Sequence, residues 1–133
     1  MLSDPTPPPF LQPKDYKFTF IDLFAGVGGF RMALQNLEGR CEFSSELNKR
    51  AQQTYFCNYG ELPEGDITLE STKAEIPETF DILCGGFPCQ AFSIAGHRKG
   101  FQETRGTLFF DVANIAKKHR PKALFLENVR NLV

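Results

Sequence analysis

The sequence predicts an α/β fold, in which a mostly parallel sheet carries helices on both faces. The main observation is that strand-like stretches alternate with stretches of helical spacing at least four times, as in right-handed β-α-β units. A hydrophobic fraction of 41% and 14 phenylalanines provide enough apolar surface for a core. At 133 residues, the chain has the length of one compact domain.

The N-terminal residues differ in composition from the rest of the chain. Five of the nine prolines lie within the first 14 residues, and such a composition favours extended conformations that bury little surface. We expect residues 1–15 to form a flexible tail and residues 16–133 to form the folded domain. A docking peptide for a partner is the alternative interpretation of the tail.

The sequence of the first half of the domain predicts two strands and two helices. Residues 18–24 are rich in β-branched and aromatic side chains, which is typical of a strand. A glycine-rich turn at residues 26–29 leads into a helix over residues 30–37, where apolar residues recur at helical spacing. Residues 41–45 predict a short strand, and residues 47–59 predict a helix that is closed by a glycine.

The second half predicts further strands, a long loop and one helix. We expect a turn with a brief strand at residues 64–68, a buried strand at 80–84, a loop at 90–106, a helix at 107–119 and a last strand at 123–126. The loop contains three glycines, and basic residues at the end of the helix suit the negative end of its dipole. The pattern of residues 69–78 is ambiguous.

Charge, hydropathy and cysteine usage argue against several classes of protein. The formal net charge of −1 gives no overall attraction to nucleic acid or membrane. No stretch approaches the roughly 20 apolar residues of a membrane span, and the N-terminus lacks the pattern of a secretory signal. The four cysteines form no Cys-x-x-Cys pair, and with only two histidines they predict no metal site. Without an export signal, we expect reduced thiols and a cytosolic protein.

Cys89 is the strongest candidate for chemistry. It follows an apolar run, residues 82–84, and the pair Gly85-Gly86, which together predict a strand and a sharp turn out of it. A thiol on a loop beyond a strand end lies where open α/β sheets keep their chemistry, and an exposed thiol can form the reactive thiolate. Cys84 lies within the strand, so we interpret it as a small apolar core residue.

The glycine-rich turn is a candidate ligand loop. Gly26, Gly28 and Gly29 directly follow a strand and would allow a ligand to approach the backbone at a helix N-terminus. Their spacing, Gly-x-Gly-Gly, differs from the Gly-x-Gly-x-x-Gly of dinucleotide-binding sites, which argues against a nicotinamide oxidoreductase. A simple tight turn remains the alternative.

Three carboxylates also follow predicted strands. Glu46 lies where nucleotide-binding sheets place the acid that binds ribose hydroxyls, and Asp66 could accept an exocyclic amine. Glu127 follows four apolar residues, so we expect it to be partly shielded from water, which favours the protonated form that can give a proton. A solvated charge, a turn aspartate and a bystander next to an N-cap at Asn128 are the respective alternatives. Because the C-terminal ends of parallel strands line one edge, we expect these groups, Cys89 and the glycine turn to face one crevice.

Taken in order, these stretches resemble the motifs of the C5-cytosine-specific DNA methyltransferases of bacterial restriction-modification systems. Pro-Cys-Gln at residues 88–90 and Glu-Asn-Val at residues 127–129 are highly specific in this order. The matching stretches are residues 20–30, 45–46, 65–68, 86–93, 99–109 and 127–130. The resemblance spans residues 18–133 and corresponds to the N-terminal part of the family's catalytic domain.

This resemblance implies the Rossmann-like fold of S-adenosylmethionine-dependent methyltransferases, incomplete at its C-terminal side. The cofactor would be S-adenosylmethionine, with S-adenosylhomocysteine as its product. Phe24 would lie against the adenine, Glu46 would hold the ribose, and the backbone of the glycine turn would approach the methionine part. Leu47 stands where many relatives carry a large aromatic residue, which implies weaker stacking on one face of the adenine. The implied cofactor-binding residues are Phe24, Ala25, Gly26, Val27, Gly28, Gly29, Glu46, Leu47, Asp66, Ile67, Pro88 and Leu108.

The resemblance also implies a reaction, the transfer of a methyl group to C5 of a cytosine in double-stranded DNA. Cys89 would add to C6 of the cytosine while Glu127 protonates or hydrogen-bonds N3, which activates C5 for methyl transfer. The base cannot be reached inside a duplex, so it would be flipped out, and Gln90, Ser93 and Arg98 would contact the DNA. Such an enzyme would work in the bacterial cytoplasm.

Other parts of this family's pattern do not occur in the sequence. A Gln-x-Arg-x-Arg motif, further strands, the target-recognition region and a last helix that walls the cofactor are missing. We therefore expect a fragment, or one half of a split enzyme, that is inactive alone and needs a second chain. The exposed edge of the last strand, residues 123–126, is expected to favour self-association. The alternatives are a non-catalytic S-adenosylmethionine-binding domain and a tRNA cytosine-5 methyltransferase.

Overall fold

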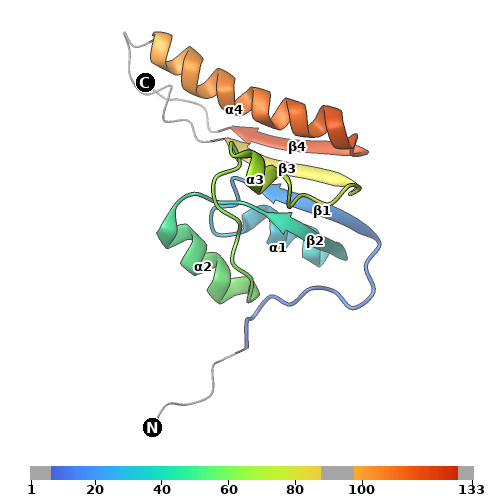
Figure 1. The fold of residues 1–133 in the computed structure, drawn as a ribbon. Helices are drawn as coiled ribbons and strands as arrows, with labels where there is room; N and C mark the ends of the chain where they lie inside the picture. Colours follow the sequence, from blue (N-terminus) through green and yellow to red (C-terminus); the bar gives the residue numbers. More distant parts are fainter. Residues whose placement is uncertain (1–6, 88–97, 129–133) are drawn as a thin grey trace.

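The structure is a computed structural model that describes residues 7–87 and 98–128. In this part of the chain, four parallel strands form one sheet in the order β2-β1-β3-β4 (Figure 1). The strands are β1 (Phe18–Leu23), β2 (Gly39–Ser44), β3 (Ile82–Phe87) and β4 (Ala123–Asn128). The helices are α1 (Gly29–Asn36), α2 (Lys49–Tyr59), α3 (Glu70–Lys73) and α4 (Arg98–His119).

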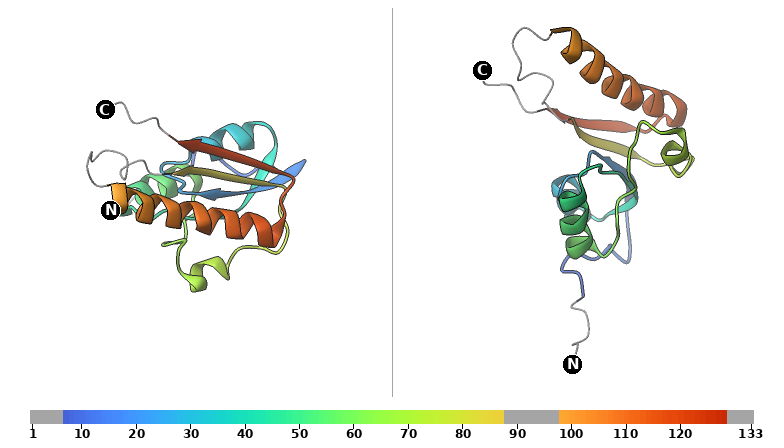
Figure 2. Two further views of the ribbon diagram at one scale, coloured as in Figure 1. Left: turned by 90° about the horizontal axis from the view of Figure 1, so that it is seen from above. Right: turned by 60° about the vertical axis from the view of Figure 1, so that its left-hand side comes forward.

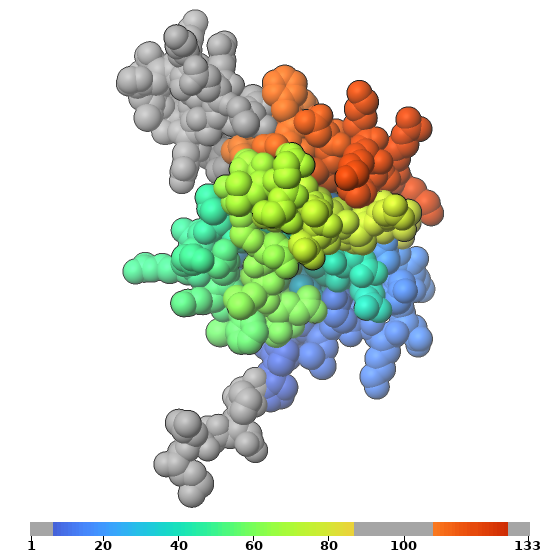
Figure 3. Space-filling model, viewed as in Figure 1, coloured from blue at the N-terminus to red at the C-terminus, as the bar shows by residue number. Residues whose placement is uncertain are grey.

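Helices cover both faces of the sheet because successive residues of a strand point to opposite sides. Ile21 of β1 packs in one apolar cluster with Val112 and Ile115 of α4. The preceding residue, Phe20, packs in a second cluster with Leu34 of α1. Figure 2 shows α4 and α1 on opposite sides of the strands, and Figure 3 shows the segment around α3 lying between α4 and α2. The predicted α/β fold is confirmed.

The residues that flank α2 set its two ends. The side chain of Asn48 accepts a hydrogen bond from the backbone N–H of Ala51 at 2.9 Å, which satisfies a donor at the start of the helix. Gly60 ends the helix with a φ of 75°, a left-handed conformation that glycine adopts without strain. The helix therefore begins two residues later than the sequence predicts, at Lys49.

The predicted sharp turn at Gly85-Gly86 is wrong. Both glycines lie inside β3, where Gly85 pairs with Leu126 and Gly86 pairs with Glu127 of β4. Two adjacent glycines suggest a turn from local preference, but ladder hydrogen bonds to a neighbouring strand keep the backbone extended. As a result, β3 and β4 each run further than predicted, to Phe87 and Asn128.

The predicted loop over residues 90–106 is wrong from Arg98 onwards, because α4 begins there. Gly100 and Gly106 lie within this helix, each at a cost of about 1 kcal/mol relative to alanine. No proline occurs between Arg98 and Pro121, so nothing removes a hydrogen-bond donor from the helical ladder. Residues 90–97 lie outside the described part of the chain.

Two smaller predictions also need correction. The brief strand expected at residues 64–68 is only an isolated bridge between Ser45 and Glu64. The second strand begins at Gly39, two residues earlier than predicted. The ambiguous stretch that follows residue 68 contains the single-turn helix α3.

The N-terminal segment is anchored to the domain along part of its length. The side-chain amide of Gln12 donates to the carbonyl of Cys41 at 2.8 Å and accepts from the N–H of Cys41 at 3.0 Å. Because β2 is an edge strand, this amide occupies backbone groups that a further strand would otherwise use. The segment that we expected to be a flexible tail therefore closes the β2 edge at Gln12; residues 1–6 lie outside the described part.

The opposite edge of the sheet is formed by β4. No described strand pairs with its outer side. Leu124, Phe125 and Leu126 are 47%, 47% and 41% exposed, as expected for an uncovered edge. In the described ranges, no helix has the length and apolar character that crossing a membrane requires.

Candidate functional site

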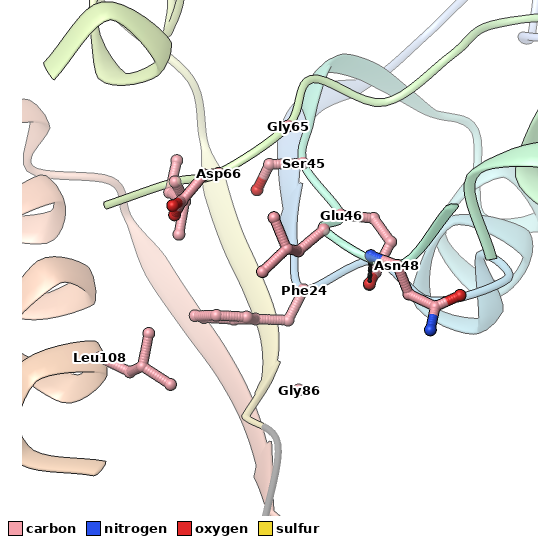
Figure 4. Close-up of a pocket in the computed structure, with 10 residues that line it drawn as sticks. Phe24, Ser45, Glu46, Asn48, Gly65, Asp66, Gly86 and Leu108 are labelled. Carbon is pink, nitrogen blue, oxygen red and sulfur yellow. Dashed lines mark hydrogen bonds between the residues drawn. The ribbon is translucent and has the colours of Figure 1, made fainter. Parts of the chain in front are cut away.

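An open pocket of about 430 Å³ lies at the C-terminal ends of the strands. The chain places β2 on one side of β1, whereas β3 and β4 lie on its other side, so the order in which strands are added reverses at β1 and β3. Open α/β sheets bind ligands at such a switch point. The residues that line the pocket are Phe24, Ser45, Glu46, Leu47, Asn48, Gly65, Asp66, Ile67, Gly86 and Leu108 (Figure 4).

Phe24 forms the apolar centre of this pocket. It directly follows β1 and has a φ of 53°, which is uncommon for a residue with a side chain. Figure 4 shows its ring extending toward Leu108 of α4, with Glu46 on the other side. A backbone conformation of this kind is typical of functional sites, where the surrounding structure holds a strained residue in place. The ring gives the pocket a flat apolar surface that suits an aromatic ligand.

Glu46 connects the pocket to the glycine turn. One carboxylate oxygen accepts a hydrogen bond from the N–H of Gly26 at 2.8 Å, and the other accepts from the N–H of Asn48 at 2.8 Å. The backbone of Glu46 is itself fixed by a hydrogen bond from its N–H to the carbonyl of Glu64 at 2.9 Å. The carboxylate is therefore held at the pocket wall, with both oxygens oriented by backbone donors.

Asp66 lines the pocket and also stabilises a turn. Its Oδ1 accepts from the hydroxyl of Thr68 at 2.7 Å and from the N–H of Thr68 at 2.9 Å. These bonds, that of the hydroxyl first, hold the pKa of Asp66 below its ordinary value, so the residue is an anion at neutral pH. Asp66 is therefore both a turn residue and a residue of the pocket.

Glu127 lies at the same edge of the sheet. It pairs with Gly86 across the ladder, and a Cβ atom at Gly86 would lie 3.3 Å from Oε2 of Glu127. Gly86 lines the pocket, so the carboxylate of Glu127 lies next to the pocket. The side chain of Glu127 is exposed, so the shielding from water that we expected is wrong for the described chain.

The structure brings together only some of the predicted site residues. Phe24, Glu46, Leu47, Asp66, Ile67 and Leu108 line one pocket. The glycine turn, Ala25, Gly26, Val27, Gly28 and Gly29, does not line it but is attached to it through Glu46. Pro88, Cys89, Gln90 and Ser93 lie outside the described residues, as does the side chain of Arg98.

The interpretation of Cys84 as an inert core residue is confirmed. Its side chain is fully buried in the cluster that contains Phe20. Burial raises the pKa of its thiol to about 12, so it is not a thiolate at neutral pH. The described residues contain no cluster of His, Cys, Asp or Glu side chains that could hold a metal ion.

Four pocket residues were not predicted as site residues, namely Ser45, Asn48, Gly65 and Gly86. A signal existed for Asn48, since an asparagine directly before a helical pattern is a common N-cap. Ser45, Gly65 and Gly86 each belong to a motif-like stretch, but their small side chains carry no chemistry that would mark them.

A buried polar network lies beneath the glycine turn. The hydroxyl of Tyr55 donates to Asp22 at 3.3 Å, and the guanidinium of Arg31 donates to Tyr55 at 3.3 Å and to Glu61 at 3.0 Å. Asp22 and Arg31 are 1% and 0% exposed. Burial raises the pKa of Asp22 to about 7, although the bond from Tyr55 and the charge of Arg31 act in the opposite direction. This network was not predicted from the sequence.

Comparisons with known proteins identify the family of the chain. A family model described as C-5 cytosine-specific DNA methylase matches residues 18–133. The chain is 72% identical over 116 residues to the type II methyltransferase M.HpaII of Haemophilus parainfluenzae, covering 87% of this chain and 32% of that protein. It is 56% identical over 121 residues to M.HhaI of Haemophilus parahaemolyticus, covering 89% and 36%. The chain thus spans about a third of the length of these relatives.

Solved structures support the same fold. A protein described as a DNA modification methyltransferase encoded within a prophage (Escherichia coli) matches 88% of this chain and 33% of its own, with a TM-score of 0.65 and 24% identity. The S. pombe Dnmt2 methyltransferase matches 87% of this chain and 37% of its own, with a TM-score of 0.63 and 22% identity. These likenesses confirm the Rossmann-like α/β fold. With the family model matched over nearly all of the chain after its N-terminal segment, the chain belongs to the C-5 cytosine-specific DNA methylase family.

Proposed function

We propose that this chain is the cofactor-binding and nucleophile-bearing part of a DNA (cytosine-5)-methyltransferase. The reaction is the transfer of a methyl group from S-adenosylmethionine to C5 of a flipped cytosine, through a covalent bond between Cys89 and C6. The observation that carries the proposal is the convergence of Phe24, Glu46 and Asp66 on one pocket beside the carboxylate of Glu127.

The residues of the pocket fit S-adenosylmethionine in their chemistry. The ring of Phe24, with Ile67 and Leu108, offers the apolar surface that an adenine needs. Glu46 offers two carboxylate oxygens for ribose hydroxyls, and Asp66 offers an anionic acceptor for the exocyclic amine. Leu47 is 68% exposed at the rim, so it would cover the ligand less closely than a large aromatic residue would. The remaining contacts are assigned to Ala25, Gly26, Val27, Gly28, Gly29 and Pro88.

Cys89 and Glu127 have complementary roles in this chemistry. Bound S-adenosylmethionine supplies an electrophilic methyl group on its sulfonium. The thiolate of Cys89 forms a bond to C6 of the cytosine, while Glu127 gives or shares a proton at N3, so that the electron pair of the C5–C6 double bond becomes available at C5. After C5 has taken up the methyl group, loss of the C5 proton expels the thiolate and restores the double bond.

The substrate would be double-stranded DNA with the target cytosine turned out of the helix. Gln90, Ser93 and Arg98 are assigned to contacts with the DNA. Those of Ser93 and Arg98 would be to backbone phosphates, which position the strand without reading its sequence. The chain spans about a third of its relatives, and no motif for reading bases was found in it. We therefore propose that it is a fragment or one half of a split enzyme, inactive alone, that acts with a second chain in the bacterial cytoplasm.

Methyl transfer tests this proposal directly. The chain alone is expected to transfer no tritium from labelled S-adenosylmethionine to plasmid DNA. When it is mixed with the part of M.HpaII that follows the matched region, we expect labelled DNA. That part would supply the contacts to the target base and to the DNA that this chain lacks. Cys89→Ser is expected to abolish this labelling, since the less acidic hydroxyl does not form the nucleophile. Scintillation counting of the recovered DNA measures the transfer.

Cys57→Ser is the matched control, because Cys57 is an exposed free cysteine on α2. It is expected to leave the labelling unchanged. Transfer by the isolated chain would contradict its proposed dependence on a second chain. Labelling of tRNA in place of DNA would identify an RNA enzyme, and cofactor binding without transfer to either would identify a non-catalytic domain.

The outer edge of β4 is a surface for self-association. Among the described residues, no strand pairs with the outer backbone groups of β4 beside exposed Leu124 and Phe125, and another strand can pair there. We propose that the isolated chain self-associates through this edge, and that Phe125→Lys weakens the association about tenfold. Phe56→Lys on α2, where Phe56 is similarly exposed at 48%, is the control that should not. Sedimentation equilibrium measures the association, and a chain that stays monomeric over a wide concentration range would contradict the proposal.

A further inference from the structure

The C-terminal end of α2 is hydrogen-bonded to the glycine turn. The side-chain amide of Asn58 donates a hydrogen bond to the carbonyl of Val27 at 3.1 Å, and the hydroxyl of Tyr59 donates to the carbonyl of Gly28. Neither Asn58 nor Tyr59 lines the pocket. Two consecutive carbonyls of the turn are therefore fixed by side chains that lie outside the site.

The ring of Tyr59 also fits directly against the turn. Gly28 has a φ of 96°, and a Cβ atom added to it would overlap the ring of Tyr59. Glycine is required here both by the left-handed backbone and by the closeness of this ring. The turn and Tyr59 thus form a single packed unit.

Tyr59 in turn is held on its other sides. The guanidinium carbon of Arg31 lies 4.6 Å from the centre of its ring, within the range of a cation–π interaction. The ring centres of Tyr55 and Phe10 lie 4.8 Å and 5.7 Å away. The N–H of Phe10 also donates to the carbonyl of Asn58 at 3.1 Å, so the N-terminal segment secures the end of α2.

The other end of α2 contacts the same turn. The carboxylate of Glu46 accepts hydrogen bonds from Gly26 and from Asn48, the N-cap of α2. Both ends of the helix are therefore connected to the turn, through Glu46, which precedes the helix, and through Asn58 and Tyr59 at its end. Of these three side chains, only that of Glu46 lies at the pocket wall.

We propose that Asn58 and Tyr59 are positioning residues for the methionine part of S-adenosylmethionine, acting through the carbonyls of Val27 and Gly28. This inference rests on the proposed function, which assigns the backbone of the glycine turn to that part of the cofactor. A turn held in its bound shape loses less conformational entropy when the ligand binds. The adenine and ribose, by contrast, are assigned to Phe24, Glu46 and Asp66, whereas the Asn58 and Tyr59 side chains donate to the glycine turn.

The test compares two ligands on the full chain by isothermal titration calorimetry. S-adenosylhomocysteine carries the amino-acid part, and 5′-methylthioadenosine keeps the adenine, ribose and sulfur but lacks it. Asn58→Ala and Tyr59→Phe each remove one hydrogen bond, so each is expected to raise the Kd of S-adenosylhomocysteine about fivefold. The Kd of 5′-methylthioadenosine is expected to stay unchanged. Gln53→Ala, at an exposed position of the same helix, is the control that should alter neither Kd.

The outcomes separate this inference from the proposed function. If the wild-type chain binds neither ligand, the cofactor assignment fails. If it binds both and the two variants bind S-adenosylhomocysteine as tightly as the wild type, the positioning role is overturned. An equal loss for both ligands would indicate a merely structural role and would also overturn it. Asn58→Ala keeps the test decisive if Tyr59→Phe does not fold, because the bond from Asn58 lies at the surface.

Discussion

Replacing Arg31 with alanine is expected to lower the free energy of unfolding by about 3 to 5 kcal/mol. Arg31 is fully buried, and its guanidinium bonds to Gln35 at 2.7 Å, to Tyr55 at 3.3 Å and to Glu61 at 3.0 Å. Alanine would remove these bonds, leave a cavity where the long side chain packs, and deprive the buried Asp22 of a nearby positive charge. Urea denaturation at neutral pH measures the loss.

Two further substitutions at Arg31 separate packing from charge. Arg31→Met keeps most of the apolar volume without the charge, so we expect it to recover at least half of the stability that alanine loses. Arg31→Lys keeps the charge, but a single ammonium cannot replace a planar guanidinium whose Nε donates to Gln35 while its Nη1 donates to Tyr55 and Glu61, so an intermediate loss is expected. The interpretation of Arg31 as a central packing element would be wrong if alanine lowered stability by less than about 1 kcal/mol.

The positions of the site residues along the sheet could be predicted from the sequence. Phe24 ends the strand predicted at residues 18–24, Glu46 directly follows the one at 41–45, and Asp66 lies in the turn with a brief strand expected at 64–68. The ends of parallel strands share one edge. Local patterns and the topology of α/β folds therefore place these residues on a common edge, whichever strands are neighbours.

The ends of the elements depended on contacts that are distant in sequence. Gly85 and Gly86 predict a turn by local preference, yet their pairing with Leu126 and Glu127 of β4 keeps them in β3. Local patterns do not report such pairing, because β4 follows only after the whole of α4. The same limitation explains why β3 and β4 were predicted too short.

The conformation of Phe24 and the burial of Arg31 left no signal in the sequence. A positive φ is typical of glycine, so a phenylalanine at the end of an apolar strand predicts continued extended backbone. An arginine near the start of a short helix predicts an exposed side chain. Its burial follows from Tyr55 and Glu61, which reach it from α2 and from the segment that follows α2.

Asp22→Asn is expected to remove a pH dependence of stability between pH 4 and pH 8. Burial raises the pKa of Asp22 from 3.8 to about 7, so in this range the folded state keeps a proton that the unfolded state has lost. The free energy of unfolding of the wild type therefore falls as the pH rises, and the loss is complete above the folded pKa. A shift of about 3 pKa units corresponds to roughly 4 kcal/mol. The stability of the wild type relative to Asp22→Asn should fall by about this amount, as measured by urea denaturation at unit steps of pH.

Asp81→Asn is the matched control, because the shift at Asp81 has the opposite sign. The backbone N–H of Thr19, which donates to Asp81 at 2.9 Å, is the main cause that lowers the pKa of Asp81 below 3.8. The stabilisation that Asp81 provides is thus fully present above the unfolded pKa and is lost only at more acidic pH. The difference between the wild type and Asp81→Asn should be flat between pH 5 and pH 8. If Asp22→Asn gave the same flat difference, Asp22 would have to be ionised in the folded protein throughout this range, and the network with Tyr55 and Arg31 would have to be strong enough to hold a buried anion.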